Sequence, residues 1–236
     1  MAKVISFVSG KGGVGKTLGA ILTSGEYALR ENQVLVIDAD PTQRFSDWFS
    51  ESIRRGNGPE FMTVTTALTK AAVAREVQLA HGKFDYVVID APGTEGAVNQ
   101  EVLRQSDIVA TPVKIGRDEV KAMAVVAADV AQVSDELGLE IPHVTYVTEL
   151  AEVQKSLSAY ATLHNFIVKL QEDGYSTRIL ETELYSRNIY KELRNGLGPL
   201  QIIDPNPTIT KARLEVQRFV RELDEILAVG KTKISA

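Results

Sequence analysis

The sequence predicts an α/β protein whose mostly parallel, twisted sheet carries helices on both faces. Short apolar runs alternate with stretches of helical periodicity along the whole chain, which is typical of such sheets. One apolar run leads through a glycine-rich loop straight into a helical stretch, and two others end in aspartate. With 236 residues and no Pro-, Ser- or Gly-rich linker, the expected organisation is a single domain, 1–236.

The individual elements follow from hydrophobic period. Runs rich in Val, Ile and Phe, as expected of buried parallel strands, are 3–9, 33–38, 61–65, 84–90, 107–113, 143–148 and 177–182. Stretches with apolar residues every three or four positions, as expected of helices, are 17–31, 43–55, 67–81, 96–105, 117–137, 151–173, 186–195 and 208–228. Glycine, proline and asparagine mark 54–60 and 194–207 as the longer loops.

Composition narrows the class of protein. The chain has no cysteine, which excludes disulfides, thiolate zinc and cysteine-held iron–sulfur clusters and suits a reducing cytoplasm. No signal peptide and no membrane-length apolar run are expected. Because the net charge is −5, any binding of nucleic acid must come from a local basic patch.

The glycine-rich loop predicts a nucleotide site. In "SGKGGVGKTLGA" (9–20), Gly10, Gly15, Lys16 and Thr17 satisfy the phosphate-loop pattern G-x-x-x-x-G-K-[ST], between a strand and a helix as that pattern requires. Backbone N–H groups of such a loop point at phosphate. Lys16 would neutralise the β- and γ-phosphates, and the Thr17 hydroxyl would hold Mg²⁺.

Three aspartates are expected beside the phosphates. Asp38 and Asp40 end one apolar run, and Asp90 ends another, so all three belong to the carboxyl edge of the sheet. Asp90 fits the Mg²⁺ partner of a phosphate-loop ATPase. Asp40, just beyond Asp38, would orient the attacking water. The alternative is that such residues only cap the following turns.

Together these segments resemble the ParA/MinD family of deviant Walker A ATPases. The resemblance rests on "KGGVGKT" (11–17), "DADPTQ" (38–43), "DYVVIDAPG" (85–93) and "SDIVATPVKIGRDEV" (106–120). In spacing the chain is most similar to short plasmid-partition ATPases of the ParA type, the ParF-like proteins, over nearly its whole length. One departure is "APGTEG" (91–96), where many relatives carry a second proline or another run of small residues.

The resemblance implies roles for specific residues. Lys11 corresponds to the signature lysine that reaches the nucleotide of the other subunit in an ATP-sandwiched dimer. Asp40 corresponds to the aspartate that supports hydrolysis, and Asp38 to one that acts near Mg²⁺ through water. Thr148 lies in the strand where relatives hold adenine, without their Asn-Arg pair. The remaining loop residues expected to contact ATP are Gly12, Gly13, Val14, Gly15 and Leu18, with Val14 and Leu18 using only their backbone N–H groups.

A basic region near the carboxyl end gives the expected DNA surface. Residues 178–221 contain eight basic and five acidic side chains, a local balance of +3. Arg187, Lys191 and Arg194 would share one helix face, and a dimer would pair two such faces for sequence-independent DNA binding. The alternative is a solvated surface. The candidate DNA-binding residues are Arg187, Lys191, Arg194, Lys211, Arg213 and Arg218.

The functional expectation is therefore a slow, Mg²⁺-dependent ATPase that dimerises with ATP, binds nucleoid DNA and positions a cargo, most simply a low-copy plasmid. The resemblance implies a ParB-like partner that stimulates hydrolysis. Two alternatives stay open: a MinD-like ATPase that binds membrane through 208–236, and a recruiting scaffold for conjugation or another large assembly. Because acidic residues interrupt the polar face of 208–236, its apolar stripe is interpreted as a packing face rather than a membrane face.

Overall fold

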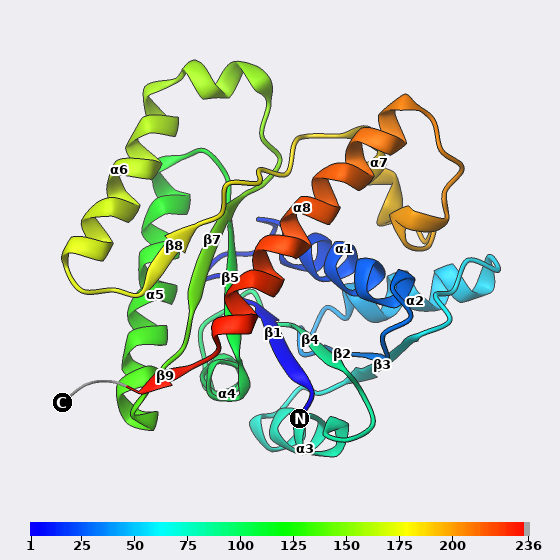
Figure 1. Ribbon diagram of the computed structural model, residues 1–236, viewed down its shortest axis with the longest axis horizontal. Coiled ribbons are helices and arrows are strands. Elements are labelled where there is room, and N and C mark those ends of the chain that lie inside the picture. Colours follow the sequence, from blue (N-terminus) through cyan, green and yellow to red (C-terminus); the bar gives the residue numbers. More distant parts are fainter. Residues whose placement is uncertain (234–236) are drawn as a thin grey trace.

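The computed structural model describes residues 1–233, and its centre is a seven-stranded parallel sheet in the order β3-β2-β4-β1-β5-β7-β8 (Figure 1). The strands of this sheet are β1 (Lys3–Phe7), β2 (Val34–Asp38), β3 (Met62–Thr66), β4 (Tyr86–Asp90), β5 (Ile108–Val113), β7 (His143–Val147) and β8 (Thr177–Ile179). The helices are α1 (Lys16–Leu29), α2 (Arg44–Arg54), α3 (Lys70–Ala80), α4 (Ala97–Gln105), α5 (Arg117–Leu137), α6 (Ser158–Glu172), α7 (Asn188–Leu193) and α8 (Pro207–Val229). The predicted α/β class with a parallel sheet is confirmed.

Side chains of successive strand residues enter opposite cores, as the two-residue period of a strand requires. Val4 of β1 belongs to the core beneath α3, α4 and α5, whereas Ile5 and Phe7 belong to the core beneath α1, α2, α7 and α8. A third cluster joins α5 and α6 to β5 and β7. Helices therefore cover both faces, and both cores are largely aliphatic.

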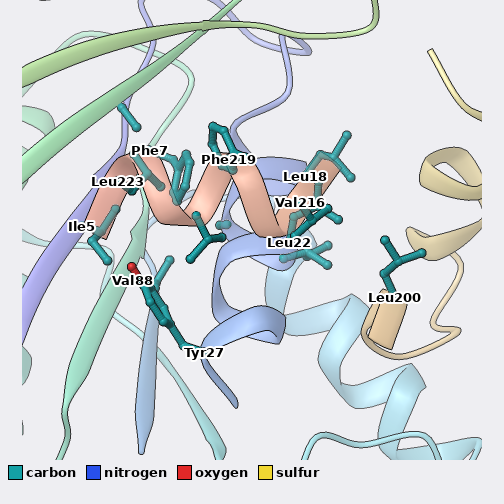
Figure 2. Close-up of a cluster of buried hydrophobic side chains, with 14 of the residues drawn as sticks. Ile5, Phe7, Leu18, Leu22, Tyr27, Val88, Leu200, Val216, Phe219 and Leu223 are labelled. Carbon is teal, nitrogen blue, oxygen red and sulfur yellow. The ribbon is translucent and has the colours of Figure 1, made fainter. Parts of the chain in front are cut away.

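The last helix seals one face of the sheet. Figure 2 shows Val216, Phe219 and Leu223 of α8 packed toward Phe7 of β1 and Leu18 of α1. Because this apolar stripe is buried in the core, the interpretation of 208–228 as a packing helix is confirmed. None of the helices within residues 1–233 is long and apolar enough to cross a bilayer.

Three details differ from the sequence prediction. The stretch expected as one helix over 151–173 divides into a 3-10 turn, η1 (Glu152–Ser156), and α6, because Leu157 between them is extended. β8 is shorter than the expected strand 177–182. A small antiparallel sheet of β6 (Leu139–Glu140) and β9 (Thr232–Lys233), together with the 3-10 turn η2 (Leu200–Ile202), has no counterpart in the prediction. Elements of two or three residues are too short to show a hydrophobic period in the sequence, so they could not be predicted from it.

One buried histidine makes folding sensitive to acid. His143 in β7 lies between the hydroxyls of Thr111 and Thr177, each 2.9 Å from a ring nitrogen. Burial lowers its pKa to about 4, so the folded protein holds this imidazole neutral. In the unfolded chain a histidine titrates near pH 6.5. The stabilisation is therefore complete above about pH 6.5 and is lost as the pH falls toward about 4.

We expect the free energy of unfolding in urea to fall by about 2 kcal/mol between pH 7 and pH 5 because of His143 alone. A His143→Gln variant keeps hydrogen-bonding capacity but has no proton to take up, so its stability should change less over that range. Equal pH slopes for the variant and the wild type would contradict this account of His143. A His164→Gln variant, which alters a histidine on half-exposed helix surface, is the matched control.

Candidate functional site

The phosphate loop lies where β1 meets α1, at the carboxyl edge of the sheet. Gly13 and Gly15 have φ angles of 75° and 118°, in a region that side chains other than glycine rarely adopt. Lys16 opens α1 and is buried, and its Nζ donates to Ser9 Oγ at 3.1 Å. Burial lowers the pKa of Lys16, although Asp90 and Asp40 partly oppose this. A buried ammonium whose hydrogen-bond partner is a hydroxyl is suited to an incoming anion.

Thr17 and Asp90 form the metal-binding side of the loop. Thr17 Oγ1 donates to Asp90 Oδ2 at 2.7 Å, which links the start of α1 to the end of β4. The other oxygen, Asp90 Oδ1, is buried and has no hydrogen-bond partner among the described residues. Burial raises the pKa of Asp90 to about 7. An orphaned carboxylate oxygen beside a threonine hydroxyl and a phosphate loop fits Mg²⁺, which prefers hard oxygen ligands.

Asp38 anchors the helix that follows it. It ends β2 directly beside Asp90 of β4 in the sheet register. Its Oδ2 accepts from the backbone N–H and the hydroxyl of Ser46, at 2.9 and 2.8 Å, and its Oδ1 accepts from the N–H of Asp40 at 3.2 Å. Burial nevertheless raises its pKa. Oδ2 is thus engaged with the first turn of α2, and Oδ1 with the loop that leads into it.

Asp40 is the more accessible carboxylate. Its Oδ1 accepts from the N–H and the hydroxyl of Thr42, at 2.8 and 2.6 Å. Burial raises the pKa of Asp40, but the bonds from Thr42, the charge of Lys16 and the N–H of Gly93 outweigh burial and lower it overall. The lowered pKa favours the ionised form of this carboxyl group, which can accept hydrogen bonds.

Gly93 brings the loop after β4 onto the phosphate loop. A Cβ atom added to Gly93 would lie 3.4 Å from Gly12 Cα and 3.5 Å from Lys16 Nζ. A Cβ at this position would therefore be in van der Waals contact with both residues of the phosphate loop. The loops after β1, β2 and β4 meet within a few ångströms of one another, as expected for the carboxyl edge of a parallel sheet.

Lys11 does not face its own nucleotide site. Its Nζ lies 2.9 Å from Glu119 Oε1, in the first turn of α5, and both side chains are partly exposed. The hydrogen bond that Lys11 donates to Glu119 is the main reason that the pKa of Lys11 is raised. The second lysine of the loop is therefore held at the surface by a carboxylate that the sequence analysis did not identify.

A cavity of about 1160 Å³ opens beside the phosphate loop and is large enough for a nucleotide. One wall is α2, with Trp48, Glu51 and Arg55, and the facing wall is the loop from Glu192 to Leu197. The two walls touch each other: a Cβ on Gly196 would clash with the Glu51 side chain, and one on Gly198 would clash with the Asn57 carbonyl oxygen. The full lining is Gly12, Gly13, Gly15, Lys16, Thr17, Leu18, Ile21, Asp40, Pro41, Thr42, Arg44, Asp47, Trp48, Glu51, Arg55, Gly93, Thr94, Glu192, Arg194, Asn195 and Leu197.

The cavity contains most of the expected nucleotide residues. Gly12, Gly13, Gly15 and Leu18 line it, whereas Val14 is buried. Thr148 lies behind the loop instead: its Oγ1 would be 3.0 Å from a Cβ on Gly15, and the hydroxyl has no hydrogen-bond partner among the described residues. Its place is thus under the phosphate loop, while the space for a base lies between α2 and the loop after α7.

Three of the candidate DNA-binding residues, Arg187, Arg194 and Arg213, are bonded to other groups of the protein. Arg187 and Arg194 flank the short helix α7 rather than sharing one of its faces. Arg187 is paired with Glu215 at 2.5 Å, and Arg194 with Glu149 at 3.3 Å.

Arg213 donates to the carbonyl groups of Leu200, Gln201 and Ile203, which holds the turn before α8. Lys191, Lys211 and Arg218 are exposed and form no ion pair with the described residues, whereas Arg194 is exposed but paired. Lys211 and Arg218 are seven residues apart on α8 and so lie on one face of it.

A family model described as VirC1 protein matches residues 2–236 of the chain. Among curated proteins, the chain is similar to "Protein ParA" of Rhizobium radiobacter, with 22% identity over 190 residues, which are 80% of this chain and 81% of that protein. These likenesses, together with those to solved structures, confirm the ParA/MinD type expected from the motifs.

Two solved structures show the shared fold. A putative plasmid partition protein from Borrelia burgdorferi B31 bound to AMPPNP has a TM-score of 0.67 and 17% identity, covering 94% of this chain and 100% of that chain. The septum site-determining protein MinD of Pyrococcus horikoshii OT3, complexed with Mg-ADP, has a TM-score of 0.67 and 16% identity, covering 96% and 99%.

Proposed function

The chain belongs to the VirC1 protein family, and from that premise we propose that it is an ATP-dependent positioning switch of the ParA/MinD type. In this proposal two ATP-bound subunits form a dimer that binds DNA without sequence preference, and slow hydrolysis releases it. The observation that carries the proposal is the phosphate loop. Lys16 of this loop lines the cavity, and Lys11 is held outside it by Glu119.

The nucleotide chemistry follows from the residues of the cavity. Lys16 would neutralise the terminal phosphates from inside the loop. Thr17 and Asp90 would supply oxygen ligands to Mg²⁺, which would add positive charge next to the leaving phosphate. The ionised Asp40 would accept a hydrogen bond from the attacking water and so orient it. The bound ligands of the related structures, AMPPNP and Mg-ADP, support ATP and Mg²⁺ as the cofactors.

A dimer is favoured because Lys11 has no place in its own cavity. Its side chain points toward the amino end of α5, so its charge is available to a nucleotide held by a second subunit. A cation supplied across an interface makes ATP part of that interface, and loss of the γ-phosphate would weaken it. Hydrolysis would in this way dissociate the dimer, and a cargo-bound partner of the ParB kind would determine when hydrolysis occurs.

The exposed cations Lys191, Lys211 and Arg218 support DNA as the ligand of the dimer. Two subunits would present six of them, and sequence-independent binding through phosphate contacts needs no base-reading side chains. The apolar stripe of α8 is buried in the core, so this stripe is not available to a membrane. A nucleoid-bound positioning ATPase is therefore favoured over a membrane-bound one.

The test is binding to a random-sequence duplex with ATP, with ADP and without nucleotide, at 50 and 200 mM salt. We expect binding only with ATP, weakened roughly 10³-fold by the higher salt if about six phosphates are contacted. Changing Lys191, Lys211 and Arg218 together to alanine should weaken binding and flatten the salt dependence.

The matched control changes Lys70, Arg75 and Lys83 to alanine, because these exposed cations lie beside α3 on the opposite face of the sheet. It should leave the salt slope unchanged. DNA binding that is independent of nucleotide would contradict the switch. An ATP-dependent dimer that binds no DNA in any state would instead favour a recruiting scaffold.

A further inference from the structure

Arg44 lines the nucleotide cavity at the first position of α2, four residues after Asp40. The residue before it, Gln43, has a φ of 49°, a left-handed conformation that residues other than glycine adopt uncommonly. This conformation turns the chain from the Asp40 loop into α2. The two bonds that Asp38 accepts from Ser46 hold the same turn in place. Arg44 therefore starts from a fixed position at the phosphate end of the cavity.

Among the described residues, the guanidinium of Arg44 has no partner, unlike the other arginines that line the cavity. Within residues 1–233 its side chain forms neither an ion pair nor a hydrogen bond. Arg55, at the far end of α2, is paired with Glu51 at 2.6 Å, and Arg194 is paired with Glu149 at 3.3 Å. Asp47 lines the same cavity one turn further along α2 without bonding Arg44. Arg44 is thus the arginine of this wall that is ready for an anion.

Arg44 and Lys16 line the same cavity. Its positive charge contributes to the lowered pKa of Lys16, after burial, which is the larger cause. Two cations that repel each other across an empty space are both stabilised when an anion enters that space. Lys16 approaches it from the phosphate loop and Arg44 from α2.

We propose that Arg44 bonds the γ-phosphate of the nucleotide held by its own subunit and thereby makes the site prefer a nucleoside triphosphate to a diphosphate. The planar guanidinium can donate two parallel bonds to phosphate oxygens, which a lysine cannot. The inference rests on the nucleotide site proposed above, but it does not depend on dimerisation or on DNA. It also gives α2 a direct means of sensing the terminal phosphate.

The experiment measures the affinities of the wild type, Arg44→Gln and Arg44→Lys for Mg-AMPPNP and Mg-ADP by calorimetry. The protein concentration is kept where sedimentation shows a monomer. Arg44→Gln should weaken AMPPNP binding about tenfold or more and change ADP binding by less than about twofold. Arg44→Lys keeps the positive charge but cannot donate two parallel hydrogen bonds, so its AMPPNP affinity should lie between those of the wild type and Arg44→Gln. Arg55→Gln is the control, since it removes an arginine of the same wall that is already paired, and it should leave the ratio of the two affinities unchanged.

Three results would overturn the proposal: equal weakening of both nucleotides, no change in either, or an AMPPNP effect that appears only at concentrations where the protein dimerises. Thermal melting shows whether Arg44→Gln is folded, and Arg44→Lys supplies a second test. If the wild type binds AMPPNP but never DNA, the positioning function fails while the Arg44 result stands. If the wild type binds no nucleotide, both fail together.

Discussion

Replacing Lys16 with alanine should abolish measurable nucleotide binding, lowering the affinity for ATP by about a hundredfold or more. Of the two lysines in the described phosphate loop, Lys16 lines the cavity and Lys11 does not. Lys16 is buried, and its hydrogen-bond partner is the neutral hydroxyl of Ser9. Its removal therefore relieves a desolvated charge, and the nucleotide-free protein should melt no earlier than the wild type. Loss of binding can then be separated from loss of the fold.

Fluorescent ATP titrated against the wild type, Lys16→Ala and Lys11→Ala measures this effect. The Lys11 variant is the natural control, since it removes a lysine from the same loop without emptying the cavity. Micromolar ATP affinity in Lys16→Ala would contradict the assignment of the phosphate loop. If Lys16→Ala without nucleotide melted at a lower temperature than the wild type, this would contradict the inference that buried Lys16 destabilises the nucleotide-free protein.

The second large effect is expected at Lys11. Lys11→Ala should bind ATP normally yet stay monomeric, because the charge that would cross to the second nucleotide is gone. Sedimentation with ATP, with ADP and without nucleotide shows the outcome, and a normal ATP-dependent dimer would refute the role of Lys11 across the interface. Glu119 holds Lys11 in the free subunit, so Glu119→Gln should make ATP-dependent dimerisation easier rather than prevent it.

We expect Glu119→Gln to dimerise with ATP at a protein concentration a few-fold lower than the wild type, a modest change because the pair is partly exposed. Glu136→Gln is the control, since it breaks an ion pair with Arg104 at the other end of the same helix. Equal dimerisation of all three proteins would show that Glu119 does not restrain Lys11.

The sequence was sufficient for the fold and for the centre of the site, because both depend on local pattern. Buried parallel strands carry unbroken apolar runs, and each of the seven central strands overlaps its predicted range. The loop around Lys16 is specified by glycines that allow its backbone angles, and Asp38 and Asp90 end their strands as predicted.

The partners of the charged side chains could not be predicted in the same way. Arg187 meets Glu215, twenty-eight residues away, and Arg213 meets three carbonyl groups of a turn. Lys11 meets Glu119, 108 residues further along the chain. Such pairings depend on how helices pack, and a local count of charges has no information about packing. The only sequence signal for Arg44 was its short distance from Asp40.

The contact between α2 and the loop after α7 has a mechanical consequence. α2 has eleven residues and is therefore roughly 16 Å long. Asp38 fixes its amino end through Ser46. Near its carboxyl end, Glu51 packs against Gly196. That loop runs on through η2 into α8, which carries Lys211 and Arg218. A random screen for mutants that bind ATP but no longer change their affinity for cargo or DNA would therefore be expected to recover substitutions at Gly196 and Gly198, far from any reacting atom.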